Sequence, residues 1–222
     1  MLRDKRRLAI QLRKEGKSYS DIKNILKVSK SALSYWLKDY PLTPKQIATL
    51  TSNKKPMQIE RFRLTMRAKR EKRLQKVYEE SSASLLPLTN RELLIAGLFL
   101  YLGEGAKQTP GQIIVSNTDP NIVKFVLNWY TNVLKIPKDK VRVNLQLYQD
   151  MDIEKEIEFW GNHLEVPKSS FWKPYIKKSI TKDIDHSGFK HGTCGLYFGS
   201  VLLHEKIMMS IKCILKAADT GV

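Results

Sequence analysis

The stretch LLIAGLFLYLGEGAK, residues 93–107, joins ten consecutive apolar or small residues to a single carboxylate held between two glycines. The run Leu93–Leu102 is shorter than the ~20 residues needed to cross a bilayer, and it fits a helix of a protein core. Thr89 and Glu92 have the spacing of a capping box in front of it. The stretch therefore predicts an apolar helix that ends at Glu104. This residue is either a solvated acid at a helix end or a residue that takes part in a chemical reaction.

Beyond this helix, strand patterns alternate with helix patterns. Strands are expected at 111–117, 141–148, 171–179 and 192–200, and helices at 120–134, 152–164 and 201–215. The stretch VRVNLQLY alternates as a half-exposed antiparallel strand does, and its polar side carries Arg142, Asn144, Gln146 and Tyr148. Residues 89–222 are thus predicted to form an α+β domain with helices on one face of a sheet.

The charge of the 222-residue chain is uneven. The whole chain has a net charge of +17, and residues 1–80 hold 22 basic and 8 acidic side chains, a net of +14. Such a segment repels itself, and a polyanion relieves the repulsion. An anionic membrane surface is the alternative partner. The charged start does not fit a signal peptide, and two cysteines form no disulfide framework. We expect a cytoplasmic, nucleoid-associated protein with no membrane partner.

Residues 4–38 have the pattern of three short helices. The first carries apolar residues at helical spacing, Leu8, Ile10 and Leu12, and stops at Gly16. Ser18 with Asp21, and then Ser29, are placed as caps of the next two helices. Pro41 follows the third. Two helices joined by a tight turn, after a supporting helix, predict a helix-turn-helix.

The segment GKSYSDIKNILKVSKSALSYWL, residues 16–37, resembles the helix-turn-helix of resolvases, invertases and many small bacterial and archaeal regulators. Lys27 stands where these families often have Gly, a difference worth roughly 1 kcal/mol at positive φ. In such a motif the exposed face of the second helix contacts base edges. The residues expected on that face are Lys30, Ser31, Ser34, Tyr35 and Lys38. The alternative is an ordinary three-helix unit whose polar face is only solvated.

Residues 41–88 are predicted to connect the helix-turn-helix domain (1–40) to the α+β domain (89–222). Thr43 and Gln46 cap a short helix, and a long helix follows from residue 56. Its basic residues go all round the helix over about 35 Å, so we expect it to neutralise DNA phosphates without reading sequence. Its candidate phosphate contacts are Arg63, Arg67, Arg70 and Arg73. A solvated spacer is the alternative.

The apolar helix ending in Gly-acid-Gly, followed by strands and helices, resembles the LAGLIDADG family of homing endonucleases, and IAGLFLYLGEG (95–105) carries the resemblance. It implies a homodimer whose motif helices pack together through small residues, and a sheet whose side chains enter the major groove. It also implies that Glu104 is catalytic and holds Mg²⁺ or Mn²⁺ with its partner copy. The implied dimer seam is Ala96, Gly97, Leu100 and Gly103.

On the sheet, Arg142, Asn144 and Gln146 offer donors and acceptors to bases. Lys173 and Lys177, expected on one side of the next strand with Tyr175, are candidates to stabilise charge during catalysis. The alternative for these strand residues is an ordinary solvent face.

Two weaker constellations remain. His186, His191 and Cys194, with Cys213, have loosely zinc-like spacing, although Cys194 alternates with Leu196 as a core strand residue would. The aromatic residues Phe159, Trp160, Phe171 and Trp172 are expected to pack in the core rather than stack on bases.

The sequence leads to a sequence-specific duplex-DNA-binding protein that acts as a homodimeric, metal-dependent endonuclease. A non-catalytic helix-turn-helix transcription regulator on a degenerate LAGLIDADG fold is the alternative. A structured-RNA binder is a third, less favoured reading, since some members of the family assist splicing.

Overall fold

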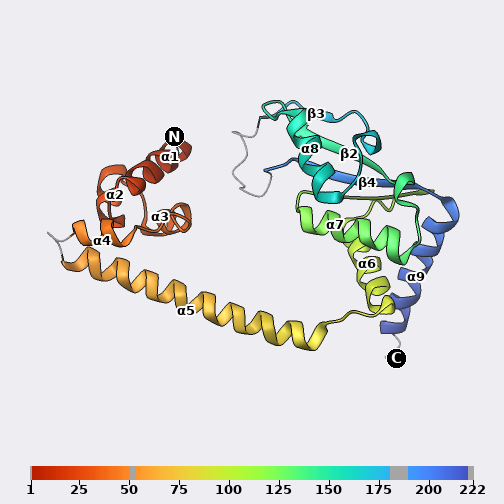
Figure 1. Cartoon of the computed structure of the whole chain (residues 1–222), viewed down its shortest axis with the longest axis horizontal. Coiled ribbons are helices and arrows are strands. Elements are labelled where there is room, and N and C mark those ends of the chain that lie inside the picture. Colours follow the sequence, from red (N-terminus) through yellow and green to blue (C-terminus); the bar gives the residue numbers. More distant parts are fainter. Residues whose placement is uncertain (1, 51–53, 181–189, 220–222) are drawn as a thin grey trace. The chain divides into compact units, whose positions relative to one another are not determined.

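The computed structural model describes residues 2–50, 54–180 and 190–219. Its contacts divide the chain into two compact units, Met1–Leu86 and Pro87–Val222, and most of their helices and strands are labelled in Figure 1. The expected connector was residues 41–88, and the part of it up to Leu86 falls within the first unit.

Three helices form the core of the first unit: α1 (Leu2–Lys14), α2 (Tyr19–Leu26) and α3 (Lys30–Trp36). Ser18 and Asp21 form the predicted capping box, and the Ser29 side chain accepts from the Ala32 backbone N–H. The side chains buried among the helices are Ala9, Ile22, Leu26, Leu33, Trp36 and Leu37. The prediction of the apolar face of α1 is partly wrong, because Leu8 is exposed and α1 buries Ala9 and Arg13 instead.

The turn between α2 and α3 has Lys27 in the left-handed region, with φ of 51°. Its backbone N–H donates to the Lys23 carbonyl, which closes the end of α2. The turn therefore has the geometry that favours glycine, although the chain carries lysine there.

Two further helices complete the first unit: α4 (Pro44–Thr49) and α5 (Lys54–Leu85). The capping box of Thr43 and Gln46 opens α4, and Gln46 Nε2 also donates to the Lys14 carbonyl at the end of α1. From Thr65 to Ser81 every side chain of α5 is exposed. The long helix therefore depends on its N-terminal half for attachment to the other helices.

The second unit holds a four-stranded sheet of β1 (Gln112–Asn117), β2 (Arg142–Tyr148), β3 (Tyr175–Lys177) and β4 (Thr193–Gly199). The strand order is β1-β4-β2-β3. β4 runs antiparallel to both of its neighbours, whereas β3 runs parallel to β2. The chain is thus mixed α+β, and β2 is not a purely antiparallel strand.

Four helices pack on one face of this sheet: α6 (Asn90–Glu104), α7 (Pro120–Asn128), α8 (Ile153–Leu164) and α9 (Val201–Asp219). A π-helical turn, Trp129–Val133, continues α7, and short 3-10 turns cover Lys138–Lys140 and Lys168–Ser170. The predicted cap Thr89 accepts from the first turn of α6, and Asp119 accepts from the first turn of α7. Buried helix residues such as Leu98 and Trp160 meet Val143, Leu145 and Leu196 of the strands.

The strict alternation expected for β2 fails at its end. Tyr148, expected on the polar side, is buried, and the ammonium of Lys177 lies 5.0 Å from its ring centre. A neighbouring strand that brings a cation over the ring explains why this phenol is covered.

Among the described residues, no single helix is both long and apolar enough to cross a membrane. One bent pair, Met57–Leu85 with Asn90–Glu104, meets the length and composition test only when its two helices are counted together.

Candidate nucleic-acid interface

Four of the five residues expected to contact bases lie on the exposed face of α3, and the fifth, Lys38, lies just beyond its end. Lys30, Ser31, Ser34, Tyr35 and Lys38 are all exposed, while the opposite face is buried in the core. The ammonium of Lys38 lies 5.8 Å from the ring centre of Tyr35. This surface therefore offers hydroxyls, an aromatic ring and two cations on one short helix and the residues directly after it.

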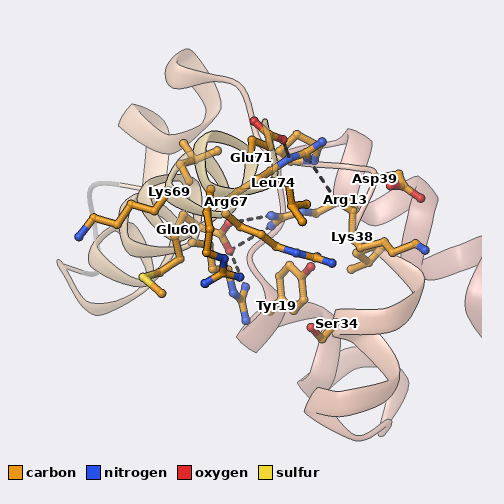
Figure 2. A pocket seen from close by; sticks show the side chains of 17 residues that line it. Arg13, Tyr19, Ser34, Lys38, Asp39, Glu60, Arg67, Lys69, Glu71 and Leu74 are labelled. Carbon is orange, nitrogen blue, oxygen red and sulfur yellow. Dashed lines mark hydrogen bonds and ion pairs between the residues drawn. The ribbon is translucent and has the colours of Figure 1, made fainter. Parts of the chain in front are cut away.

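A groove of about 720 Å³ runs between the end of α3 and residues 60–74 of α5 (Figure 2). Ser34 and Lys38 line it, so it is continuous with the exposed face of α3. Seven cations and three acids line the groove. The cations are Arg13, Lys38, Arg63, Arg67, Lys69, Arg70 and Arg73. The groove is therefore a concave, strongly basic surface, which concentrates positive potential.

A buried ion pair holds α5 against α1. Arg13 Nη2 donates to Glu60 Oε2 at 2.7 Å, and Arg13 Nη1 donates to Glu60 Oε1 at 3.3 Å. The two side chains are only 3% and 5% exposed. Arg63 Nη1 donates to the other side of the same carboxylate at 3.0 Å. Glu60 is therefore the counter-charge of two arginines and attaches the long helix to the first three.

Tyr19 of α2 completes this junction. The guanidinium carbon of Arg63 lies 3.5 Å from its ring centre, and that of Arg13 lies 4.6 Å away. Burial raises the pKa of the Tyr19 phenol. Arg13, Tyr19 and Glu60 cannot be recognised as a cluster from the sequence, because a lone acid in a basic helix carries no signal of its distant partner.

The α5 arginines differ in how far protein partners engage them. Arg63 is half-buried at Glu60 and Tyr19. Arg67 pairs with Glu71 at 2.9 Å, and its Nη1 donates to the Lys38 carbonyl at 3.4 Å. Arg70 and Arg73 are exposed along the groove. Arg70 and Arg73 are thus better presented to a phosphate than Arg63 is.

In the second unit, Glu104 lies exposed at the end of α6. Asn117 Nδ2, at the end of β1, donates to its Oε2 at 3.2 Å. A Cβ on Gly105 would lie 2.5 Å from the Tyr101 carbonyl oxygen, whereas one on Gly103 would meet open space. The second glycine is therefore required by packing and the first is not. No group of three His, Cys, Asp or Glu side chains able to hold a metal ion occurs in the described part of the chain.

The predicted dimer seam is divided between two sides of α6. Ala96 and Gly103 are exposed, but Gly97 is buried and Leu100 packs partly into the core. A Cβ on Gly97 would lie 2.1 Å from Trp129 Nε1. Gly97 is small because Trp129 crosses α6 there, so its place in an exposed seam is a wrong prediction.

The predicted catalytic residues do not lie together in one chain. Lys177 is on β3, at the opposite edge of the sheet from β1, whose Asn117 contacts Glu104. Three strand spacings separate these edges, about 14 Å. Lys173 is exposed in the segment before β3 rather than within it. Glu104 and Lys177 of one chain therefore lie at opposite edges of the sheet.

The base-contacting candidates of β2 lie on the face of the sheet opposite the helices. Arg142 is exposed, and its Nη1 donates to the Ser169 carbonyl at 3.1 Å. Asn144 and Gln146 are half-buried. Trp172 was predicted to pack in the core, but it is 47% exposed on this face, and its ring centre lies 5.1 Å from that of Tyr197. Trp160 is fully buried, as expected.

The residues whose spacing resembles that of a zinc site do not form such a site in the part of the chain that the structure describes. His191 Nδ1 is 2.9 Å from Glu156 Oε2, and the His191 ring stacks on Phe159. Cys194 is buried, which raises the pKa of its thiol, while Cys213 is exposed on α9. His186 lies outside the described residues.

Comparison of the chain with protein-family models, with curated proteins and with solved structures finds no match.

Proposed function

We propose that the protein binds duplex DNA through its first unit, with α3 in the major groove and α5 along the phosphate backbone. The single observation that carries the proposal is the continuity of two surfaces. Ser34 lies on the exposed face of α3, Lys38 lies just beyond the end of that helix, and both also line the basic groove formed with α5. Base contacts specify and phosphate contacts position, and this surface offers both kinds of side chain. The proposal implies a cytoplasmic, nucleoid-associated protein.

The test is selection of duplexes from a random pool, followed by affinity measurements over a range of salt concentrations. Arg70→Ala and Arg73→Ala should each flatten the slope of log K against log salt by about 0.9, the value for one lost phosphate contact. Tyr35→Ala should change the selected sequence instead. Lys212→Ala, at an exposed position of α9, is the matched control. The proposal fails if the α3 and α5 variants change binding no more than this control does.

A second function, metal-dependent DNA cleavage by a LAGLIDADG-like homodimer, is favoured by a specific observation. Glu104 is exposed at the end of an apolar helix, and Ile95, Ala96, Phe99 and Gly103 are exposed together along that helix. One carboxylate and the Asn117 amide are too few ligands for a hard divalent cation, so the carboxylate of a second copy would have to join them. Bound Mg²⁺ or Mn²⁺ would supply charge stabilisation to a scissile phosphate.

This function is tested with a supercoiled plasmid library and Mg²⁺ or Mn²⁺, at matched DNA occupancy. Wild type and Glu158→Gln, an exposed acid of α8, should make discrete double-strand cuts, whereas Glu104→Gln should bind without cutting. Phe99→Asp should yield monomers in sedimentation. If wild type binds and never cuts, the protein is a non-catalytic transcription regulator. Stronger competition by structured RNA than by duplex DNA would favour the RNA-binding reading.

A further inference from the structure

The helix-free face of the sheet has a composition unlike an ordinary solvent face. The register assigns side chains to it: Arg142 is opposite Tyr197, Asn144 opposite Gly195, and Gln146 opposite both Thr193 and Tyr175. The alternate positions, such as Val143 and Leu196, belong to the core. The polar side of three neighbouring strands is thus lined by amides, an arginine and tyrosines.

Three aromatic rings on this face are exposed or half-exposed, those of Trp172, Tyr175 and Tyr197. Trp172 is 47% and Tyr175 is 61% exposed. The Trp172 backbone N–H donates to the Val143 carbonyl at 2.8 Å, which fixes the indole beside β2. Its ring is tilted by 56° against that of Tyr197. Large rings that remain exposed on a rigid sheet offer stacking surfaces that require little ordering on binding.

Gly195 explains how the Tyr197 ring reaches its position. A Cβ at Gly195 would lie 2.8 Å from Tyr197 Cε2 and 2.6 Å from Ser116 Oγ. The ring therefore lies across the glycine, close to the sheet surface. Any larger residue there would push the ring away from the sheet.

The charges on this face suit a polyanion. Arg142 and Lys177 lie on β2 and β3, and Lys173 precedes β3. No Asp or Glu occurs in the four described strands. The face therefore combines cations for phosphates with rings for bases.

The depth at which the amide side chains lie in this face determines which form of nucleic acid can contact them. Base edges of duplex DNA lie at the floor of a major groove about 8.5 Å deep, so side chains that read them must project from the sheet. Asn144 and Gln146 are half-buried, and Asn144 Nδ2 is directed to the Lys173 carbonyl at 3.5 Å. The aromatic side chains are more exposed than these amides. A base stacked flat on a ring brings its edge down to such amides, which requires an unpaired base.

We propose that the helix-free face of the sheet binds an unpaired nucleic-acid strand, with bases stacked on Trp172 and Tyr175 and phosphates at Arg142 and Lys177. This activity goes beyond duplex binding by the first unit and does not depend on it. Its ligand is single-stranded DNA or RNA, recognised by base faces rather than by sequence.

The experiment uses the full chain, labelled 12-mers of deoxythymidine and of uridine, an abasic 12-mer of equal charge, and a 12-base-pair duplex, at about 0.25 M salt to weaken backbone contacts. Trp172 supplies a local readout. It is 47% exposed, whereas Trp36, Trp129 and Trp160 are 8% exposed or less. Stacked bases should quench the accessible indole fluorescence, and the abasic strand should not.

Trp172→Ala and Tyr175→Ala should each weaken binding of the base-containing strands by about 5-fold to 100-fold, the range for loss of one stacked base. Binding of the abasic strand and of the duplex should not change. Tyr78→Ala, which removes an exposed aromatic side chain of α5, is the control. Tyr175 is the more exposed of the two, so its variant keeps the test valid if Trp172→Ala misfolds. Tighter binding of the deoxythymidine strand would assign DNA as the ligand, and tighter binding of the uridine strand would assign RNA. Equal affinity of variants and wild type for the base-containing strands, or an equal loss on the duplex, would overturn the proposal.

Discussion

The buried carboxylate of Glu60 should determine whether α5 stays attached to the helices that carry α3. Glu60→Ala would leave the Arg13 guanidinium, 3% exposed, with no counter-charge, and would release Arg63 from its partner. Removing one member of a buried ion pair costs about 3–5 kcal/mol, because the remaining charge stays buried and unpaired. Glu71→Ala is the matched control on the same helix. It breaks the Arg67 pair, whose side chains are 48% and 63% exposed, and such a pair contributes about 0–1 kcal/mol.

Hydrogen exchange of the full chain, followed by mass spectrometry, measures the loss of stability in each segment separately. It does not require one unfolding curve to describe two units. In Glu60→Ala, amides of α1–α3 and of residues 57–66 should exchange about 100 to 4,000 times faster, and amides of the second unit should be unchanged. Glu71→Ala should alter exchange less than about 5-fold. Equal protection in Glu60→Ala and wild type, or equal losses in the two variants, would refute the role assigned to this ion pair.

Three further predictions concern backbone and burial. Gly97→Ala should destabilise the second unit by about 1–3 kcal/mol or more, because its Cβ would overlap the Trp129 indole; thermal unfolding followed by near-ultraviolet circular dichroism checks this. Lys27→Gly should stabilise the first unit by up to about 1 kcal/mol, since it relieves a φ of 51°, and slower amide exchange in α2 and α3 would show it. In the native protein a disulfide reagent should modify Cys213 at once and Cys194 only after unfolding. Because burial raises the folded-state pKa of Cys194, the second unit should lose stability as pH rises above the unfolded thiol value of about 8.5, which unfolding at pH 7 and pH 10 would reveal.

Local signals predict the elements well, because their causes lie within a few residues. The caps at Ser18, Ser29, Thr89 and Asp119 each accept a hydrogen bond from a backbone N–H two or three positions ahead, so their spacing is visible in the sequence. The alternation of β2 likewise predicts which of its side chains face the core: Val143, Leu145 and Leu147 do, and Tyr148 does not. The burial of Tyr148 on the other side is not visible in the sequence, because the cation over its ring comes from another strand.

Distant contacts explain what the sequence could not predict at the site. Gly97 looks like a small residue for a helix seam, and only the position of Trp129 shows that it faces inward. Trp172 follows Phe171 and resembles a core residue in sequence, but its backbone N–H donates to the Val143 carbonyl of β2 and its indole lies exposed on the outer face. Arg13 reads as one more basic residue of α1, although it is nearly fully buried against a carboxylate 47 positions away.

The surroundings of Glu104 show whether its carboxylate stabilises the fold or has another role. A helix C-terminus carries a partial negative charge, so a carboxylate there is unfavourable by about 0.3–1 kcal/mol. The cation near this end, Lys107, donates to the Leu102 carbonyl rather than to Glu104. The carboxylate accepts one hydrogen bond, from the Asn117 amide, and is otherwise exposed. Neither the helix nor the core gains from an acid at this position. Glu104→Gln would keep an acceptor for Asn117 while removing the unfavourable charge. A loss of DNA cleavage in that variant, with α6 as stable as before, is therefore attributable to chemistry rather than to folding.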